Sequence, residues 1–313
     1  MKPKRKRRLQ NLILLLFSTA ITLVVAEYAY RWVLFSGGEN FKGMRDAAYF
    51  CSDSEDDYWK LYYEFGGDFK PPKSPHPLLG WVGEFDRQTY LHYETVKVGS
   101  RRPVLLYGDS FSACVKESHC FQDLLNVDST FNKNNYLLNY GVGGYGVDQA
   151  AMLCSKTAPH FERPLVVFGM LTTDMDRTIL SVRTGQKPYL DEEGGKLKLK
   201  GLPIDPDPAH YFEENGVGIN SYLYRRFLHS DMNFLPYRIT SSLNKKYDWI
   251  EKKKRVNALL VKKITAELKA NDIDFVFLIF HFEDDMMSPN SEKNWRDLHL
   301  REIMAENDAP YIW

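Results

Sequence analysis

A serine in a strand-to-helix turn is the clearest candidate nucleophile in this chain. Ser110 follows Gly108 and Asp109, directly after the apolar, β-prone run 104–106. The glycine lets the backbone turn tightly. The serine then lies near a helix N-terminus, where free N–H groups favour developing negative charge. Asp109 and Ser110 are also preferred capping residues, so helix capping is the alternative role. The chemistry to which this spacing points is nucleophilic attack by the Ser110 hydroxyl.

Three further blocks with polar or glycine residues follow later apolar runs. They are Gly141 to Gly146 with Asp148 and Gln149, then Thr172 to Arg177, and then His281 with Glu283, Asp284 and Asp285. Ligands of open α/β sheets bind beyond the carboxyl ends of the strands, so we expect these blocks to face one crevice with Ser110. Bare glycine N–H groups beside a nucleophile suit an oxyanion hole.

The same glycines also match the letters of a dinucleotide-binding loop, Gly141-x-Gly143-x-x-Gly146. That fingerprint belongs in the first strand-to-helix turn and needs an acidic residue about 20 positions on. Here the loop follows the second predicted strand, and Glu162 lies ahead of the next strand. A nucleotide-binding protein is therefore the less favoured interpretation, and we expect no cofactor.

Alternating apolar runs and helix-like segments predict the elements that position these blocks. The predicted strands are 104–107, 136–140, 165–171, 275–280 and 311–313, and the predicted helices are 121–125, 147–157 and 252–270. Continuously apolar strands separated by helices predict a parallel sheet covered on both faces. We therefore expect a three-layer α/β/α, flavodoxin-like domain over residues 101–313.

Two other segments surround that predicted domain. Residues 36–100 are expected to be an irregular lead-in of loops and short strands. Residues 178–249 are expected to be an insertion with a hairpin that turns at 191–195. Insertions at the end of a sheet strand often shape a site, which is what we expect of this one.

The N-terminus combines a basic cluster with an uncharged apolar run. Residues 1–8 carry six basic side chains and no acidic one, and residues 12–26 are apolar. This pattern addresses the chain to a membrane. Cleavage after Ala26 would make it a signal peptide. Continuation to Phe35 would make residues 1–35 a tail and transmembrane anchor of about 20 apolar residues ending in an aromatic belt.

We favour the anchor, with Glu27 and Arg31 spaced to form an ion pair. Either outcome keeps the basic end in the cytoplasm. The expected location is therefore a single-pass helix in the cell membrane with the globular part outside the cytoplasm, periplasmic or at the cell surface.

Charge and cysteine content limit the partners further. Formal net charge is zero, but beyond residue 8 the chain has 35 basic against 41 acidic residues. A basic cluster confined to the terminus does not favour a nucleic-acid partner. The cysteines at 51, 114, 120 and 154 could form two disulfides after export, in three pairings, or could be four buried apolar residues. Their spacing does not match a zinc site, and we expect no metal.

In this order the blocks resemble the SGNH/GDSL hydrolase family, membrane-anchored type, over Pro103 to Trp313. The first block is Gly108-Asp109-Ser110-Phe111-Ser112, the second is Asn139-Tyr140-Gly141-Val142-Gly143-Gly144, and the third runs from Phe168 to Asp174. Thr173 stands where the family usually has Asn. The lead-in Pro77 to Trp81 and the N-terminal anchor look like those of membrane-tethered members.

The resemblance implies acyl-ester chemistry with Ser110 as nucleophile. The N–H groups of Ser110 and Gly144 and the side chain of Thr173 would hold the oxyanion, with Asp109 and Asp174 in support. The acyl-enzyme would pass its acyl group to water, as a hydrolase, or to an acceptor hydroxyl, as an O-acyltransferase. The expected substrate is an ester-linked acyl group on an extracytoplasmic glycan or lipid.

The family's Asp-x-x-His block, which supplies the base, is not found in its usual place after the fifth strand. Asp207-Pro208-Ala209-His210 matches its letters but lies in the insertion, and Asp297-Leu298-His299 falls in a predicted helix. Three interpretations stay open. The chain is a truncated version of a longer hydrolase, His281 substitutes as base, or the protein is a non-catalytic relative that binds a glycan or lipid.

Overall fold

The structure, a computed structural model, describes residues 3–66, 72, 75–114, 119–229, 250–281 and 295–313. The chain forms two compact units, one of residues 1–69 and 215–247 and the other of residues 70–214 and 248–313. The predicted lead-in 36–100 and the predicted insertion 178–249 are therefore each divided between the two units. The predicted boundaries 1–35, 36–100 and 101–313 remain predictions.

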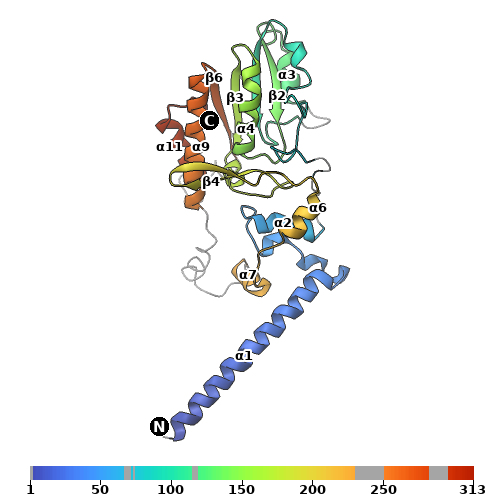
Figure 1. Cartoon of the computed structure of the whole chain (residues 1–313), viewed down its shortest axis with the longest axis vertical. Helices are drawn as coiled ribbons and strands as arrows, with labels where there is room; N and C mark the ends of the chain where they lie inside the picture. The colour runs from blue at the N-terminus through green and yellow to red at the C-terminus, as the bar shows by residue number, and fades with distance from the viewer. Residues whose placement is uncertain (1–2, 67–71, 73–74, 115–118, 230–249, 282–294) are drawn as a thin grey trace. The chain divides into compact units, whose positions relative to one another are not determined.

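The larger unit is built on a five-stranded parallel sheet (Figure 1). Its strands are β1 (Arg102–Gly108), β2 (Asn135–Gly141), β3 (Leu165–Leu171), β6 (Asp274–Phe280) and β7 (Tyr311–Ile312). Their order is β2-β1-β3-β6-β7. This is the flavodoxin-like order, in which the direction of winding reverses beside the first strand. The predicted α/β class with a parallel central sheet is confirmed.

Helices connect these strands. They are α3 (Phe121–Val127), α4 (Val147–Thr157) followed by η4 (Ala158–His160), α9 (Ile250–Ala270) and α11 (Trp295–Glu306). Apolar side chains of α4, α9 and α11 join one core cluster with Tyr107, Phe168 and Phe277 of the sheet. Alternate strand residues point to the opposite face. There, Val104 and Leu106 belong to a smaller cluster.

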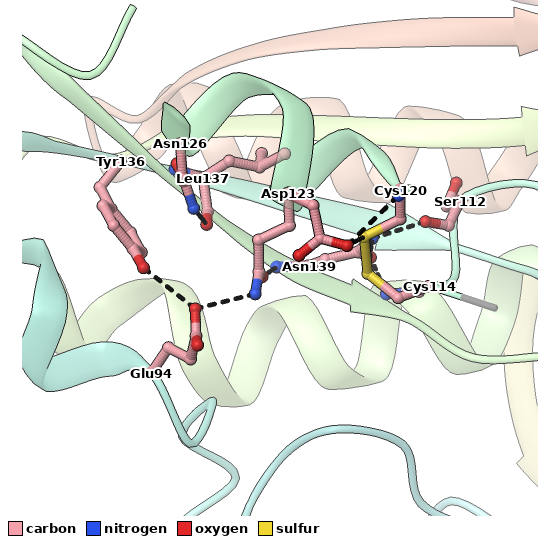
Figure 2. The surroundings of a disulfide bond; sticks show 11 residues. Glu94, Ser112, Cys114, Cys120, Asp123, Asn126, Tyr136, Leu137 and Asn139 are labelled. Atoms are coloured by element: carbon pink, nitrogen blue, oxygen red, sulfur yellow. Dashed lines mark hydrogen bonds between the residues drawn. A yellow bond between two sulfur atoms is a disulfide. The ribbon is translucent and has the colours of Figure 1, made fainter. Parts of the chain in front are cut away.

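Short helix α3 covers the outer edge of strand β2 (Figure 2). The Asn126 side chain accepts a hydrogen bond from Leu137 N and donates one to Leu137 O, both at 2.8 Å. Gln122 Oε1 accepts from Asn139 N at 2.7 Å. These side chains form hydrogen bonds with backbone groups of β2 that would otherwise be free to pair with another strand.

The predicted hairpin is present in the larger unit. Strands β4 (Tyr189–Glu193) and β5 (Lys196–Lys200) pair antiparallel around Gly194 and Gly195. Both glycines have positive φ, 60° and 76°, which a tight turn requires. The same unit contains η3 (Thr95–Val98), α5 (Asp174–Arg177) and α6 (Pro208–Glu214).

The smaller unit contains the N-terminal helix. Its elements are α1 (Pro3–Ser36), η1 (Glu39–Met44), η2 (Ala47–Tyr49), α2 (Asp56–Glu64) and α7 (Tyr222–Leu228). Within α1, the stretch Arg7–Ser36 is long and apolar enough to span a membrane, which holds for no other helix among the described residues. The predicted pair is present, with Arg31 Nε 2.7 Å from Glu27 Oε1. Glu27 also accepts from Tyr222 N and Leu223 N and so caps α7.

Two expectations are corrected here. The described part of the lead-in contains the expected loops, but helices α2, η1, η2 and η3 stand in place of the expected short strands, and strand-like pairing is limited to isolated bridges. Asp56 and Asp57 favour α2 because negative charge stabilises a helix N-terminus. The cysteines divide between the two alternatives. Cys114 and Cys120 form a disulfide, while Cys51 and Cys154 are free and buried.

Candidate active site

The turn that carries Ser110 rests on three glycines in register. Gly108 at the end of β1 pairs with Gly141 of β2 and with Gly169 of β3. A Cβ on Gly108 would overlap the Gly169 carbonyl oxygen and Ser112 Oγ, and one on Gly141 would lie 2.5 Å from Ala113 N. The chain can fold back over the sheet edge because these side chains are absent. The fully buried Ser112 hydroxyl donates to Gly169 O at 3.3 Å.

Asp109 and Ser110 have different roles in this turn. Asp109 is buried, and its Oδ1 accepts from Phe111 N at 2.8 Å, which fixes the turn. Ser110 is exposed, and its Oγ donates to Asp109 Oδ2 at 3.3 Å. Residues 109–114 form a turn and not the expected helix start, and the next described helix is α3. Asp109 therefore fixes this turn, while the Ser110 hydroxyl remains accessible at the carboxyl edge of the sheet.

The glycine loop after β2 lies beside Ser110. A Cβ on Gly143 would lie 4.0 Å from Ser110 Cβ. Gly144 has φ of +83°, and a Cβ there would lie 2.5 Å from Thr184 Oγ1. Trp81 Nε1 donates to Gly143 O at 3.1 Å and anchors the loop. The structure thus brings the predicted nucleophile and the predicted oxyanion loop together.

Segments remote in sequence hold this loop in place. Gln149 Nε2 donates to Leu79 O at 2.7 Å, which ties the lead-in to the start of α4. Lys187 Nζ lies 2.8 Å from Asp148 Oδ2, and both side chains are fully buried. Burial raises the pKa of Asp148, and Lys187 opposes that rise. Sequence reasoning missed Lys187 because nothing local marks a partner 39 positions from Asp148.

An arginine after β3 bridges two buried carboxylates. Arg177 Nη1 lies 3.0 Å from Asp109 Oδ2 and 2.6 Å from Asp174 Oδ1. Asp174 Oδ2 accepts from Leu171 N at 2.9 Å. Burial raises the pKa of Asp174 well above its usual range, Arg177 opposes the rise, and the Asp109 carboxylate adds to it. Arg177 was not predicted as a site residue, although its i, i+3 spacing from Asp174 was a signal.

Thr173 is the helix cap of α5, and its side chain makes no capping hydrogen bond. It comes just after Thr172 at the end of β3, the strand beside β1, so it lies on the same sheet edge as Ser110. Its position is compatible with the predicted oxyanion role, which stays a prediction.

His281 directly follows β6. Its described contacts are with residues other than Ser110. Its Nε2 is 3.6 Å from Asp297 Oδ1, and neither atom has a hydrogen-bond partner in the described structure. Its ring centroid is 4.6 Å from that of Trp313, which follows β7. Since β7 flanks β6 on the side away from β3 and β1, these contacts direct the ring away from Ser110.

The remaining histidine candidates lie elsewhere. Exposed His210 bonds through Nδ1 to Asp205 Oδ2 at 2.7 Å, and this bond raises its pKa. His299 Nε2 lies 2.9 Å from Lys254 O. Glu283, Asp284 and Asp285 lie outside the described residues. Within the described ranges, no group of three or more His, Cys, Asp or Glu side chains could hold a metal ion.

A cavity of about 480 Å³ lies between α4 and α9, away from Ser110. Its lining includes Pro159, beyond the end of α4, and Ile273, which precedes β6. Both belong to the amino-terminal edge of the sheet, opposite the edge that carries the Ser110 turn. This cavity therefore does not contribute to the candidate site.

No protein-family model and no curated protein matches the chain. Structures of Axe2, an acetylxylan esterase from Geobacillus stearothermophilus, match it over 69% of this chain and 78% of theirs, with 12–14% identity and a TM-score of 0.32. A further Axe2 mutant, described as an acetyl-xylooligosaccharide esterase, matches at 14% identity and the same TM-score. At this level of similarity the match assigns no activity to the chain.

Proposed function

We propose that this protein is an SGNH-type serine esterase or O-acyltransferase with Ser110 as nucleophile. The observation that carries the proposal is the approach of the Gly143–Gly144 loop to Ser110 over the glycine row of the sheet. An exposed serine beside bare backbone N–H groups is the arrangement that acyl transfer needs.

In the proposed reaction, Ser110 Oγ attacks the ester carbonyl while a base takes its proton. The N–H groups of Ser110 and Gly144 and the Thr173 hydroxyl stabilise the oxyanion, and collapse expels the alcohol with a proton. Water or an acceptor hydroxyl then attacks the acyl-enzyme and releases Ser110. Asp109 and Asp174, linked through Arg177, hold the turn in position and do not touch the substrate.

The proposal requires a base. His281 would serve only after its ring turns from Asp297 and Trp313 toward β1. A base from a segment outside the described residues is the alternative.

We further propose that α1 anchors the protein in the cell membrane with the catalytic unit outside the cytoplasm. The length and apolar character of Arg7–Ser36 support a membrane span, and the six basic residues at positions 1–8, which precede or begin this stretch, support a cytoplasmic N-terminus. The substrate would then be an acylated glycan or lipid of the cell envelope.

The test combines covalent labelling with turnover. The full chain in lipid nanodiscs is treated with a fluorophosphonate probe, the modified residue is located by mass spectrometry, and p-nitrophenyl acetate hydrolysis is measured. We expect labelling at Ser110 and loss of both signals in Ser110→Ala. Ser155→Ala, an exposed serine on α4, is the matched control and should retain both. Hydrolysis unchanged in Ser110→Ala would refute the assignment.

A second candidate function is that of a catalytically silent binding protein of this fold. The hydrogen bond from Ser110 Oγ to Asp109 Oδ2 favours it, because the described structure links this hydroxyl to a carboxylate already paired with Arg177 and not to a histidine. Absence of both labelling and turnover in a folded, membrane-inserted chain would favour this second function.

A further inference from the structure

Three phenylalanine rings gather beside Ser110. Phe111 is the next residue, and its ring centroid lies 5.9 Å from that of Phe280 at the end of β6. Phe121, at the start of α3, lies 6.4 Å from Phe280 in a stacked arrangement. A Cβ on Gly169 would lie 3.1 Å from the Phe280 ring, so this ring packs against the glycine that is paired with Gly108.

Much of this aromatic group is exposed to solvent. Phe111 is 43% exposed and Phe121 is 40% exposed. Leu124 and Leu125 follow Phe121 by three and four positions, on the same face of α3, and are also exposed. Single exposed apolar residues are ordinary, but a contiguous apolar patch marks a binding surface.

The disulfide joins the two segments that carry Phe111 and Phe121. Phe111 precedes Cys114 by three positions, and Phe121 directly follows Cys120. The Cα atoms of the two bonded cysteines are 5.0 Å apart. Asn139 Nδ2 donates to Ser112 O at 2.7 Å on the same stretch (Figure 2). A surface ordered before binding loses less entropy when it receives a ligand.

We propose that Phe111, Phe121 and Phe280, here called the acyl surface, bind the acyl chain of the ester that Ser110 attacks. This inference rests on the proposed function and names its substrate class, an ester of a fatty acid of about six or more carbons. An acetyl group is too short to cover the rings. A sugar needs polar partners for its hydroxyls, which phenylalanine side chains do not supply.

The test is a chain-length series of p-nitrophenyl acetate, butyrate and octanoate with the full chain in nanodiscs. Each methylene removed from water is worth about fourfold in binding, so we expect kcat/KM for octanoate to exceed that for acetate about tenfold or more. Phe121→Ala should lower this octanoate-to-acetate ratio at least about fivefold. Val127→Ala, also exposed on α3, should leave the ratio unchanged.

A second measurement does not depend on turnover. Octanoate binding is followed by saturation-transfer NMR in Ser110→Ala and in the same chain with Phe121→Ala added. Weaker binding in the double variant supports the acyl surface. A flat chain-length profile with active Ser110, or equal octanoate binding by both variants, overturns it.

Two further outcomes distinguish an acyl-binding role of these rings from a wrong nucleophile and from a dimer contact. If no ester is cleaved and Ser110 is not labelled, the proposed function fails. The NMR comparison still tests whether the acyl surface binds octanoate. If Phe121→Asp converts a dimer to a monomer by light scattering without changing the octanoate-to-acetate ratio, the surface is a contact between two copies, and the acyl assignment is overturned.

Discussion

At the residue scale, Arg177 separates two carboxylates that would otherwise repel one another in a buried setting. Asp109 and Asp174 both lie within 3.0 Å of its Nη1, and both are almost fully buried. Removing one partner of such a group leaves a buried charge without compensation, which is costly. The position of the Ser110 turn therefore depends on the ion pairs of Arg177, which lies after β3.

This cluster predicts a pH dependence of stability. Because the pKa of Asp174 is raised in the folded state, its contribution to stability is fully present below the unfolded value of about 3.9. The contribution is lost as pH rises through the higher folded value. Asp174→Asn should remove this contribution, so the free energy of unfolding should fall less between pH 5 and pH 8 in the variant than in wild type. Urea denaturation at both pH values measures it.

Asp272→Asn, an exposed position, is the matched control for that experiment and should leave the pH dependence as in wild type. An Asp174→Asn chain whose stability changes with pH as in wild type would contradict the assignment to Asp174.

Thr173 offers a gain-of-function test of the oxyanion site. Asparagine reaches farther than threonine, and one oxyanion donor is worth about 100-fold or more in kcat. We expect Thr173→Asn to raise kcat for p-nitrophenyl acetate about tenfold and Thr173→Val to lower it. Thr130→Asn, on the exposed loop after α3, should have no effect. Equal rates in all three variants would remove Thr173 from the site.

His281 can be tested by direct substitution. Since its described contacts are with Asp297 and Trp313, we expect His281→Gln to lower kcat less than about tenfold. General-base removal costs about 100-fold or more. His160→Gln, on the exposed end of η4, serves as control. A loss of 100-fold or more in His281→Gln alone would establish a ring that swings toward Ser110.

At the element scale, the loop between β1 and α3 is shaped by glycines on one side and by a disulfide on the other. Gly108, Gly141 and Gly169 allow the chain to fold over the sheet. The disulfide joins Cys114 to Cys120, six positions later, before α3 begins. The strand register thus positions the beginning of the loop, and a covalent bond positions its end.

The covalent contribution can be measured. Closing so short a loop restricts the unfolded chain and is worth roughly 2 kcal/mol. Replacing both Cys114 and Cys120 by Ser should lower the free energy of unfolding by about that amount in denaturant titrations. Reductant should destabilise wild type similarly and leave the double variant unchanged. A double variant that responds to reductant as wild type does would place the effect at another site.

Local pattern and long-range contact differ in how far the sequence reveals them. Helix α4 and strand β3 have the predicted bounds, 147–157 and 165–171, because periodicity and continuous apolar runs are local properties. The strand register that aligns Gly108, Gly141 and Gly169 cannot be read from any one segment of the sequence. The pair Lys187–Asp148 cannot be read from local sequence either, and the four cysteines alone do not single out the Cys114–Cys120 disulfide.

At the scale of the whole molecule, the proposed membrane anchor depends on the apolar stretch of α1. Arg7–Ser36 has the length of a membrane span, and six basic residues precede or begin it. An acyl-chain substrate and a membrane anchor are mutually consistent, because lipids are concentrated where the anchor would hold the enzyme.

Membrane insertion has a simple test. The chain should remain in the membrane fraction after carbonate extraction. Leu15→Arg combined with Ile21→Arg should release it, since each central arginine costs about 2.5–3.5 kcal/mol of insertion free energy. Two arginines at exposed positions outside α1, Val127→Arg and Leu199→Arg, are the matched control and should not release the chain. Extraction of wild type by carbonate would contradict the anchor.

The buried pair Lys187–Asp148 has a consequence for anyone who shortens this protein. Residues 178–214 look dispensable, because they contribute no strand to the five-stranded sheet. Deleting them would remove Lys187, the counter-ion of the buried Asp148 carboxylate at the start of α4, next to the Gly143–Gly144 loop. Residues 178–214 therefore support the start of α4, beside the Gly143–Gly144 loop, through Lys187. A shortened version of this chain should keep these residues, or replace Asp148 by an uncharged residue at the same time.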